Sequence, residues 1–153
     1  RCEGLEIRMG DARIVLEDER RRGELQGFDV IAMDAFNDDT IPVHLITREA
    51  VTLYFSKLSG DGILLLHISN RYVDLAPVLA ALAEENGFAG RICEDDEDDD
   101  DIEKSSSTWV ILAKKEADFG ALAANNSWKK LDRRPSVRPW TDDFSNILAV
   151  FQW

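Results

Sequence analysis

An acidic segment follows an apolar one at residues 28–39, and these residue types at this spacing are suited to binding a positively charged molecule. The apolar part, FDVIAMDA at 28–35, has the near-continuous hydrophobic pattern of a central parallel strand covered on both faces. Four polar residues then occur within six positions: Asp34, Asn37, Asp38 and Asp39. Ligands of α/β sheets bind beyond the carboxyl ends of the strands, and carboxylates there attract cations. The segment therefore predicts an acidic pocket at the end of this strand.

Other polar residues fall at the expected carboxyl ends of neighbouring strands. Asp11 follows an alternating segment at 5–10, and the turn HISN at 67–70 follows an apolar run. His67 has two interpretations, because imidazole titrates near neutral pH and can carry a proton, yet a strand-end histidine is often only a hydrogen-bonded structural residue. His44, in a loop, is a second candidate for lining the same pocket.

The elements that would position these residues alternate between strand and helix patterns. Strands are predicted at 5–10, 28–35 and 62–69, helices at 14–25, 47–58 and 75–86, and a turn at 59–62. Thr47 and Asp74 are placed to cap the second and third helices, and Gly87 is placed to end the third. This succession implies right-handed crossovers and a sheet sandwiched by helices.

The last third of the chain predicts strands of a different kind. Segments 90–94 and 107–115 are expected to form an antiparallel pair at one end of the sheet, with a polar helix near 118–124 and a last strand at 146–153. The predicted fold class is therefore α/β: a three-layer, Rossmann-like, mostly parallel sheet with an antiparallel C-terminal strand pair.

Composition narrows the class of protein. The 153 residues suit one domain, and the net charge of −12 argues against nucleic-acid binding, which needs a basic surface. Much of that charge lies in EDDEDDDD at 94–101, within an expected solvated loop at 94–106. No run approaches the length of a membrane span, so no membrane contact is expected. Cys2 and Cys93 are expected to be reduced thiols of a cytoplasmic protein, and no metal site is predicted.

Four segments resemble bacterial spermidine-synthase-like proteins, which share the class I S-adenosylmethionine-dependent methyltransferase fold. They are GDAR at 10–13, FDVIAMDAF at 28–36, the segment 41–72, and PWTDDFSNIL at 139–148. The resemblance implies a seven-stranded sheet in which this chain, truncated at its N-terminus, supplies the third strand onward. The preceding strands would carry the glycine-rich cofactor loop, and no GxGxG occurs in the sequence. The chain is therefore expected to hold half of a cofactor pocket and to bind cofactor poorly or not at all.

The resemblance also implies roles for individual residues. Asp11, with Ala12 beside it, matches the acid that accepts from the adenine amino group of the cofactor. Asp34 matches the catalytic acid after the fourth strand, which takes a proton from the attacking amine. The family's second aspartate is replaced by Asn37, so that charge pairing with the substrate would fall to Asp38 or Asp39.

Three further residues belong to family-like segments. His67 lies in the matching substrate-facing turn after the fifth strand. Asp142 and Asp143 belong to WTDDFSN, where they either close the amine side of the pocket or cap a turn.

The implied activity is transfer of an aminopropyl group from decarboxylated S-adenosylmethionine to a small cationic amine, with this segment inactive alone. Methyl transfer from S-adenosylmethionine to another small molecule is one alternative, since Asn37 weakens the polyamine assignment. A non-catalytic regulatory domain of the same fold, or the cytosolic part of a membrane-attached protein, is another.

The resemblance also leaves one edge of the sheet unpaired, because the two strands that precede this chain in the family would border residues 28–34. Residues 5–10 are therefore expected to pair elsewhere, or two chains are expected to pair as a homodimer through this exposed edge.

Overall fold

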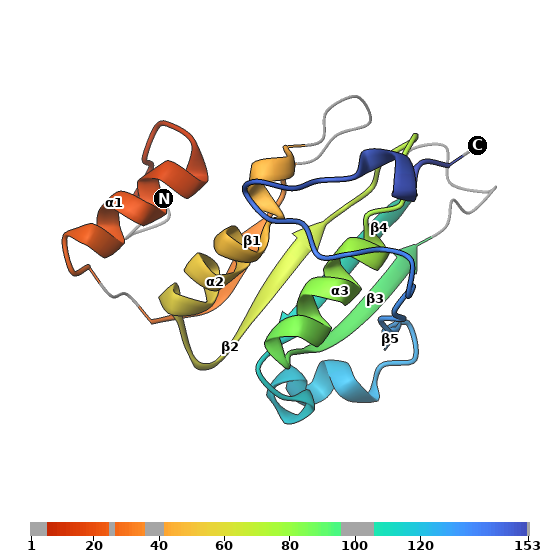
Figure 1. Cartoon of the computed structure of the whole chain (residues 1–153). Coiled ribbons are helices and arrows are strands. Elements are labelled where there is room, and N and C mark those ends of the chain that lie inside the picture. The colour runs from red at the N-terminus through yellow and green to blue at the C-terminus, as the bar shows by residue number, and fades with distance from the viewer. Residues whose placement is uncertain (1–5, 25–26, 36–41, 96–105, 153) are drawn as a thin grey trace.

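A five-stranded sheet forms the centre of the computed structural model, which describes residues 6–24, 27–35, 42–95 and 106–152. The strands are β1 (Phe28–Met33), β2 (Leu58–His67), β3 (Ala89–Asp95), β4 (Ser107–Ala113) and β5 (Lys129–Lys130), in the spatial order β1-β2-β4-β3-β5 (Figure 1). β1 pairs in parallel with β2, and every other pairing is antiparallel.

The strand directions explain how the sheet relates to the predicted one. β4 is inserted antiparallel between β2 and β3, so β1, β2 and β3 run in the same direction although only β1 and β2 touch in parallel. The antiparallel pair at one end of the sheet is confirmed. Parallel pairing is less extensive than predicted, because the reversed strand β4 separates β3 from the other two strands of its direction.

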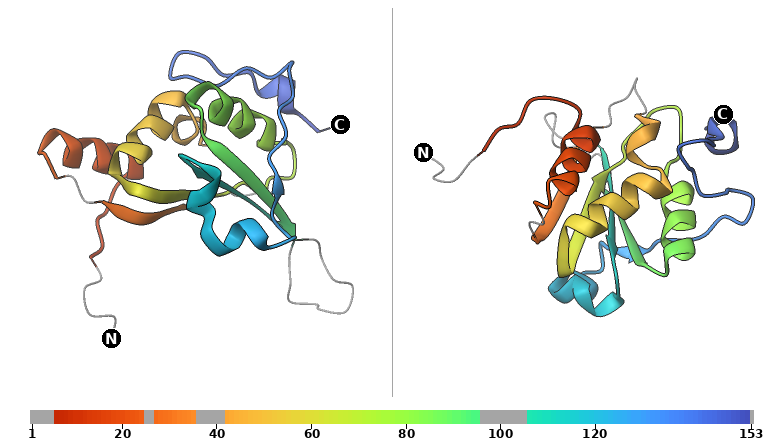
Figure 2. Two further views of the ribbon diagram at one scale, coloured as in Figure 1. Left: turned by 90° about the horizontal axis from the view of Figure 1, so that it is seen from below. Right: turned by 60° about the vertical axis from the view of Figure 1, so that its left-hand side comes forward.

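Three helices lie on one face of the sheet: α1 (Ala12–Arg21), α2 (Arg48–Lys57) and α3 (Ala76–Asn86). The left view of Figure 2 shows them on one side of the strands, with the short 3-10 segment Glu116–Ala124 on the other. Two of the predicted caps are present: Thr47 Oγ1 accepts from Ala50 N, and Gly87 ends α3 in the left-handed conformation with φ of 69°. The predicted Asp74 cap is wrong, because the N-cap of α3 is Leu75, and the Asp74 carboxylate, one residue earlier, accepts from Ala76 N at 3.1 Å.

The main hydrophobic core lies between the sheet and the helices. β2 contributes Leu64 and Leu66, and α2 and α3 add Tyr54 and Leu79, all of them fully buried. The C-terminal segment crosses this helical side and adds Trp140, whose carbonyl accepts from Arg48 N at 2.8 Å. A smaller cluster around Ile111, Ala113 and Phe119 lies on the opposite face.

Three further sequence predictions are wrong. The described residues 6–10 form no strand, because no strand lies beside them, and Ile7 and Met9 are 76% and 89% exposed. The expected turn at 59–62 is part of β2, which begins at Leu58 by pairing with Phe28. The C-terminal segment forms a 3-10 helix, Ile147–Val150, followed by a single bridge between Val73 and Phe151 instead of a strand. None of the helices in the described part of the chain is long and apolar enough to cross a membrane.

Candidate functional site

Asp34 lies directly beyond the carboxyl end of β1 and is joined to the end of β2. Its Oδ1 atom is 2.8 Å from Nδ1 of His67, the last residue of β2. Parallel pairing causes this contact, because Met33 is opposite Leu66 and the next residue of each strand therefore falls at the same edge. The Asp34 side chain is 66% exposed, so its carboxylate remains accessible to a solute.

The His67 ring is held on its other sides as well. Its Nε2 atom is 2.7 Å from Ser69 Oγ, and that oxygen accepts from Thr108 N at 2.8 Å. The ring also stacks on Trp109, the residue opposite it on β4, with centroids 4.6 Å apart and an angle of 23° between the planes. The side chain is only 22% exposed as a result. His67 is therefore a constrained residue and not a free surface histidine.

A second group of polar residues surrounds the start of α1. Asp11 caps the helix, since its Oδ1 accepts from Ile14 N at 3.0 Å, while its Oδ2 lies 2.9 Å from Nε2 of His44. Hydrogen bonds from Ile14 and then from His44 lower the pKa of Asp11. His44 lies in the short 3-10 helix Val43–Leu45, so this contact joins the start of α1 to that helix.

Arg13 connects this group to the C-terminal segment. Its guanidinium binds both carboxylate oxygens of Asp142, at 2.8 and 2.5 Å, and also donates to the His44 carbonyl at 2.7 Å. Thr47 donates to Asp142 as well, at 2.7 Å. The hydrogen bond from Arg13 lowers the pKa of Asp142, and the same ion pair raises the pKa of Arg13.

A hollow of about 480 Å³ lies beside the Arg13–Asp142 pair. Its lining includes Pro42, His44, Asp143 and Phe144 in addition to that pair. Because Asp142 is already neutralised by Arg13, Asp143 is the lining carboxylate that is placed to meet a cation. Asp142 thus pairs with Arg13, and Asp143 is exposed at the hollow, while the choice between closing a pocket and capping a turn stays a prediction for both.

The predicted site residues therefore form two groups in the structure. One contains Asp34 and His67, and the other contains Asp11, Asp142 and Asp143, with Ala12 exposed beside Asp11. Asn37, Asp38 and Asp39 lie outside the described residues. The functional roles of all these residues remain predictions.

Four residues of these groups were not predicted as site residues: Arg13, Thr47, Ser69 and Trp109. Thr47 was predicted only as a helix cap. Arg13 and Asp142 are 129 positions apart, and Trp109 reaches His67 only through the pairing of β4 with β2. Ser69 alone had a local signal, because a hydroxyl two positions after a strand-end histidine can meet its ring.

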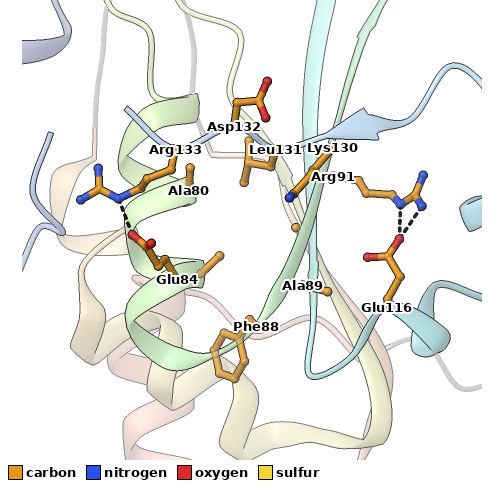
Figure 3. A pocket seen from close by; sticks show the side chains of 12 residues that line it. Ala80, Glu84, Phe88, Ala89, Arg91, Glu116, Lys130, Leu131, Asp132 and Arg133 are labelled. Carbon is orange, nitrogen blue, oxygen red and sulfur yellow. Dashed lines mark hydrogen bonds and ion pairs between the residues drawn. The ribbon is translucent and has the colours of Figure 1, made fainter. Parts of the chain in front are cut away.

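A larger hollow, of about 610 Å³, lies at the opposite, amino end of β3, between α3 and the segment 130–133 (Figure 3). The arginines at its rim are paired: Arg91 Nε donates to Glu116 at 2.8 Å, and Arg133 Nε to Glu84 at 2.7 Å. These pairs neutralise both arginines, and none of the predicted site residues is among the residues that line the hollow.

Comparisons with known proteins give partial matches. No protein-family model matches the sequence. The polyamine aminopropyltransferase of Vibrio vulnificus (strain CMCP6) is 40% identical over 58 residues, which are 38% of this chain and 19% of that protein. The structure of a probable spermidine synthase from Corynebacterium glutamicum ATCC 13032 matches with a TM-score of 0.57 and 17% identity, over 95% of this chain and 57% of that one. The structure of M1.HpyAVI matches with a TM-score of 0.50 and 20% identity, over 72% of this chain and 55% of that one.

These similarities confirm the resemblance and the fold class. The chain is similar to spermidine-synthase-like proteins, and its sheet has the Rossmann-like α/β fold of the methyltransferase type. It spans little more than half the length of the solved structures, and its match spans about a fifth of the curated relative.

Proposed function

We propose that this chain is the C-terminal part of a cytoplasmic catalytic domain that transfers an aminopropyl group from decarboxylated S-adenosylmethionine to a small cationic amine. The observation that carries the proposal is the exposed Asp34 carboxylate, fixed by His67 at the carboxyl end of a parallel strand pair. The name of the Vibrio relative, a polyamine aminopropyltransferase, supports the same chemistry.

The role proposed for Asp34 follows from the chemistry of amines. Amines are protonated near neutral pH, and an ammonium group has no lone pair for attack. Asp34 accepts one proton from the ammonium, and the freed nitrogen attacks the carbon next to the sulfonium. The new carbon–nitrogen bond forms as the carbon–sulfur bond breaks, and the bonding electrons neutralise the sulfur. A negative charge at this position also favours both the cationic amine and the sulfonium.

The residues around Asp11 fit part of the adenosyl group. Adenine presents an amino donor beside a ring-nitrogen acceptor. Asp11 offers a carboxylate, and Ala12, exposed at the first position of α1, offers a backbone amide from the unpaired first turn of the helix. When bound, the cofactor supplies the electrophilic carbon. The sequence has no GxGxG loop to hold the rest of the cofactor, so we propose that the isolated chain is inactive.

A second candidate keeps the fold and changes the transferred group. Asn37 stands where spermidine synthases have a second acid, and its amide can accept a hydrogen bond from the far ammonium of a diamine but offers it no negative charge. Methyl transfer from S-adenosylmethionine to a small molecule with one basic group is compatible with a single carboxylate at Asp34.

Titration calorimetry on the full-length protein tests the proposal. Decarboxylated S-adenosylmethionine and putrescine are expected to bind, and binding of S-adenosylmethionine instead would favour methyl transfer. Asp34→Asn is expected to lower kcat by about 10²- to 10⁴-fold while leaving cofactor affinity largely unchanged. Asp29→Asn, which removes an exposed carboxylate from the same strand, is the matched control. Binding of none of the three compounds, or full activity of Asp34→Asn, would contradict the assignment.

A further inference from the structure

We propose that His67 is a positioning residue for Asp34 and does not itself bind substrate. In this arrangement His67 carries its single proton on Nδ1 and donates it to Asp34, while Ser69 and Trp109 keep the ring in place. The functional part of this proposal rests on the function proposed above, because it assigns Asp34 as the base.

The position of the ring proton follows from the contact with Asp34. An ionised carboxylate can only accept a hydrogen bond, so the distance of 2.8 Å between Asp34 Oδ1 and Nδ1 of His67 places the ring proton on Nδ1. In a neutral imidazole Nε2 is then the acceptor, and it lies 2.7 Å from Ser69 Oγ, whose hydroxyl donates to it. The Ser69 oxygen still has a lone pair with which it accepts the backbone N–H of Thr108 at 2.8 Å.

The strand register makes this arrangement rigid. His67 is opposite Trp109 across the β2–β4 pair, and the stacked indole covers one face of the imidazole. Ser69 is fixed by the backbone of the same strand, β4, through Thr108. A 180° flip of the ring would put carbon atoms in place of both nitrogens and break both hydrogen bonds, and any other rotation would also break the stacking, so that one rotamer is strongly preferred.

The consequence for Asp34 is a carboxylate with two different oxygens. Oδ1 is occupied by His67, and Oδ2 has no hydrogen-bond partner among the residues that the structure describes. His67 thereby fixes the rotamer and leaves Oδ2 to accept the substrate proton. Because both imidazole nitrogens are occupied, His67 has no free polar atom with which to bind an amine.

His44 provides an internal comparison, since the chain has only two histidines. Its carboxylate contact uses the opposite nitrogen, Nε2, which lies 2.9 Å from Asp11 Oδ2. His44 is therefore expected to carry its proton on Nε2 and His67 on Nδ1.

Long-range ¹H–¹⁵N correlation spectra of the chain, labelled at histidine and recorded well above the ordinary histidine pKa of about 6.5, measure this directly. The variant His44→Gln leaves only the His67 signals and so assigns them. We expect a protonated Nδ1 for His67 in the native chain and in the control Asp29→Asn. Asp34→Ala is expected to give a mixture of the two tautomers, because it removes the carboxylate that accepts the Nδ1 proton.

Kinetics on the full-length protein test the functional part. His67→Ala is expected to lower kcat by up to about 100-fold, the effect of a misplaced catalytic group, with little change in the KM of the amine. His67→Gln keeps an amide donor for Asp34 and is expected to recover part of this loss.

The possible failures can be told apart. A His67 protonated on Nε2, or a rise in the amine KM as the main effect of both His67 variants, overturns the positioning role even if Asp34→Asn is inactive. If the full-length protein binds none of the titrated compounds, the proposed function fails, and the spectra still decide whether His67 donates to Asp34.

Discussion

Replacing Lys57 alone, Glu19 alone, and then both together tests what holds α1 in place. The Lys57 side chain is fully buried at the end of α2, and its Nζ atom lies 3.0 Å from Glu19 Oε2 and 2.7 Å from the Glu24 carbonyl. Glu19 lies in α1 with only 7% of its side chain exposed, and it also pairs with Arg8. Little apolar surface of α1 contributes to the core, so this buried ion pair is a main attachment of the helix.

The magnitude follows from what each variant leaves behind. Breaking a buried ion pair costs about 3–5 kcal/mol, because an uncompensated charge remains, whereas replacing both partners by apolar residues of similar volume is close to neutral. Glu19→Leu leaves the buried ammonium of Lys57 with one carbonyl, and we expect a loss near 5 kcal/mol. Lys57→Met leaves Glu19 with Arg8 as a partner, and we expect a loss near 3 kcal/mol. The double variant is expected to lose about 1 kcal/mol or less.

Urea unfolding followed by circular dichroism measures these free energies for the four proteins of the cycle. The decisive feature is strong non-additivity, with the double variant more stable than either single variant. Losses below about 1 kcal/mol in both single variants, adding in the double, would show that the pair is solvated and that α1 is held by other contacts. The result bears on the candidate site, because α1 carries Asp11 and Arg13 at its first turn.

Three further predictions concern stability and association. Gly62→Ala would place a Cβ atom 2.7 Å from the Phe28 carbonyl and should cost about 1–3 kcal/mol in urea unfolding, whereas Gly60→Ala, with open space around it, should be neutral or slightly stabilising. The pKa of Asp142 is lowered, so the ionised Asp142 stabilises the fold above the ordinary pKa of 3.8, and this stabilisation is lost as the pH falls through and below that value. Between about pH 5 and pH 3 the unfolding free energy of Asp142→Asn should therefore drop less than that of the native chain. β1 is the edge strand of the described sheet, and Val30 on it is 52% exposed. The chain should therefore form homodimers in analytical ultracentrifugation, and Val30→Lys should make it monomeric. A native chain that stays monomeric at high concentration would contradict this prediction.

Elements with strong local patterns were predictable from the sequence. The apolar run before Asp34 forms β1, and the helical spacing after Thr47 forms α2 with the expected cap. Gly87 ends α3 because only a residue tolerant of positive φ fits that position. In each case the residues that decide the structure lie within a few positions of one another.

The failures share a different cause. The alternation of Ile7 and Met9 is a genuine strand pattern, but a strand also needs a neighbour, and the described residues supply none beside it. The apolar residues at 147–150 become a 3-10 helix because the segment packs against the helical side of the core, where Val150 is buried, and not against a free sheet edge. Local propensity gave the wrong answer wherever the tertiary partner decided the outcome.

The same reasoning explains why the surroundings of Asp34 were only half predicted. An acid at the carboxyl end of β1 follows from the sequence alone. Its pairing with His67 requires the β1–β2 register, and the Trp109 stack requires the insertion of β4 beside β2 in reverse direction. A one-residue shift in either register would move a ring to the other face of the sheet. The chemistry available to Asp34 thus depends on two strand pairings as much as on the identity of the residue, and variants that disturb the β2–β4 pairing should weaken the Asp34–His67 contact without touching either residue.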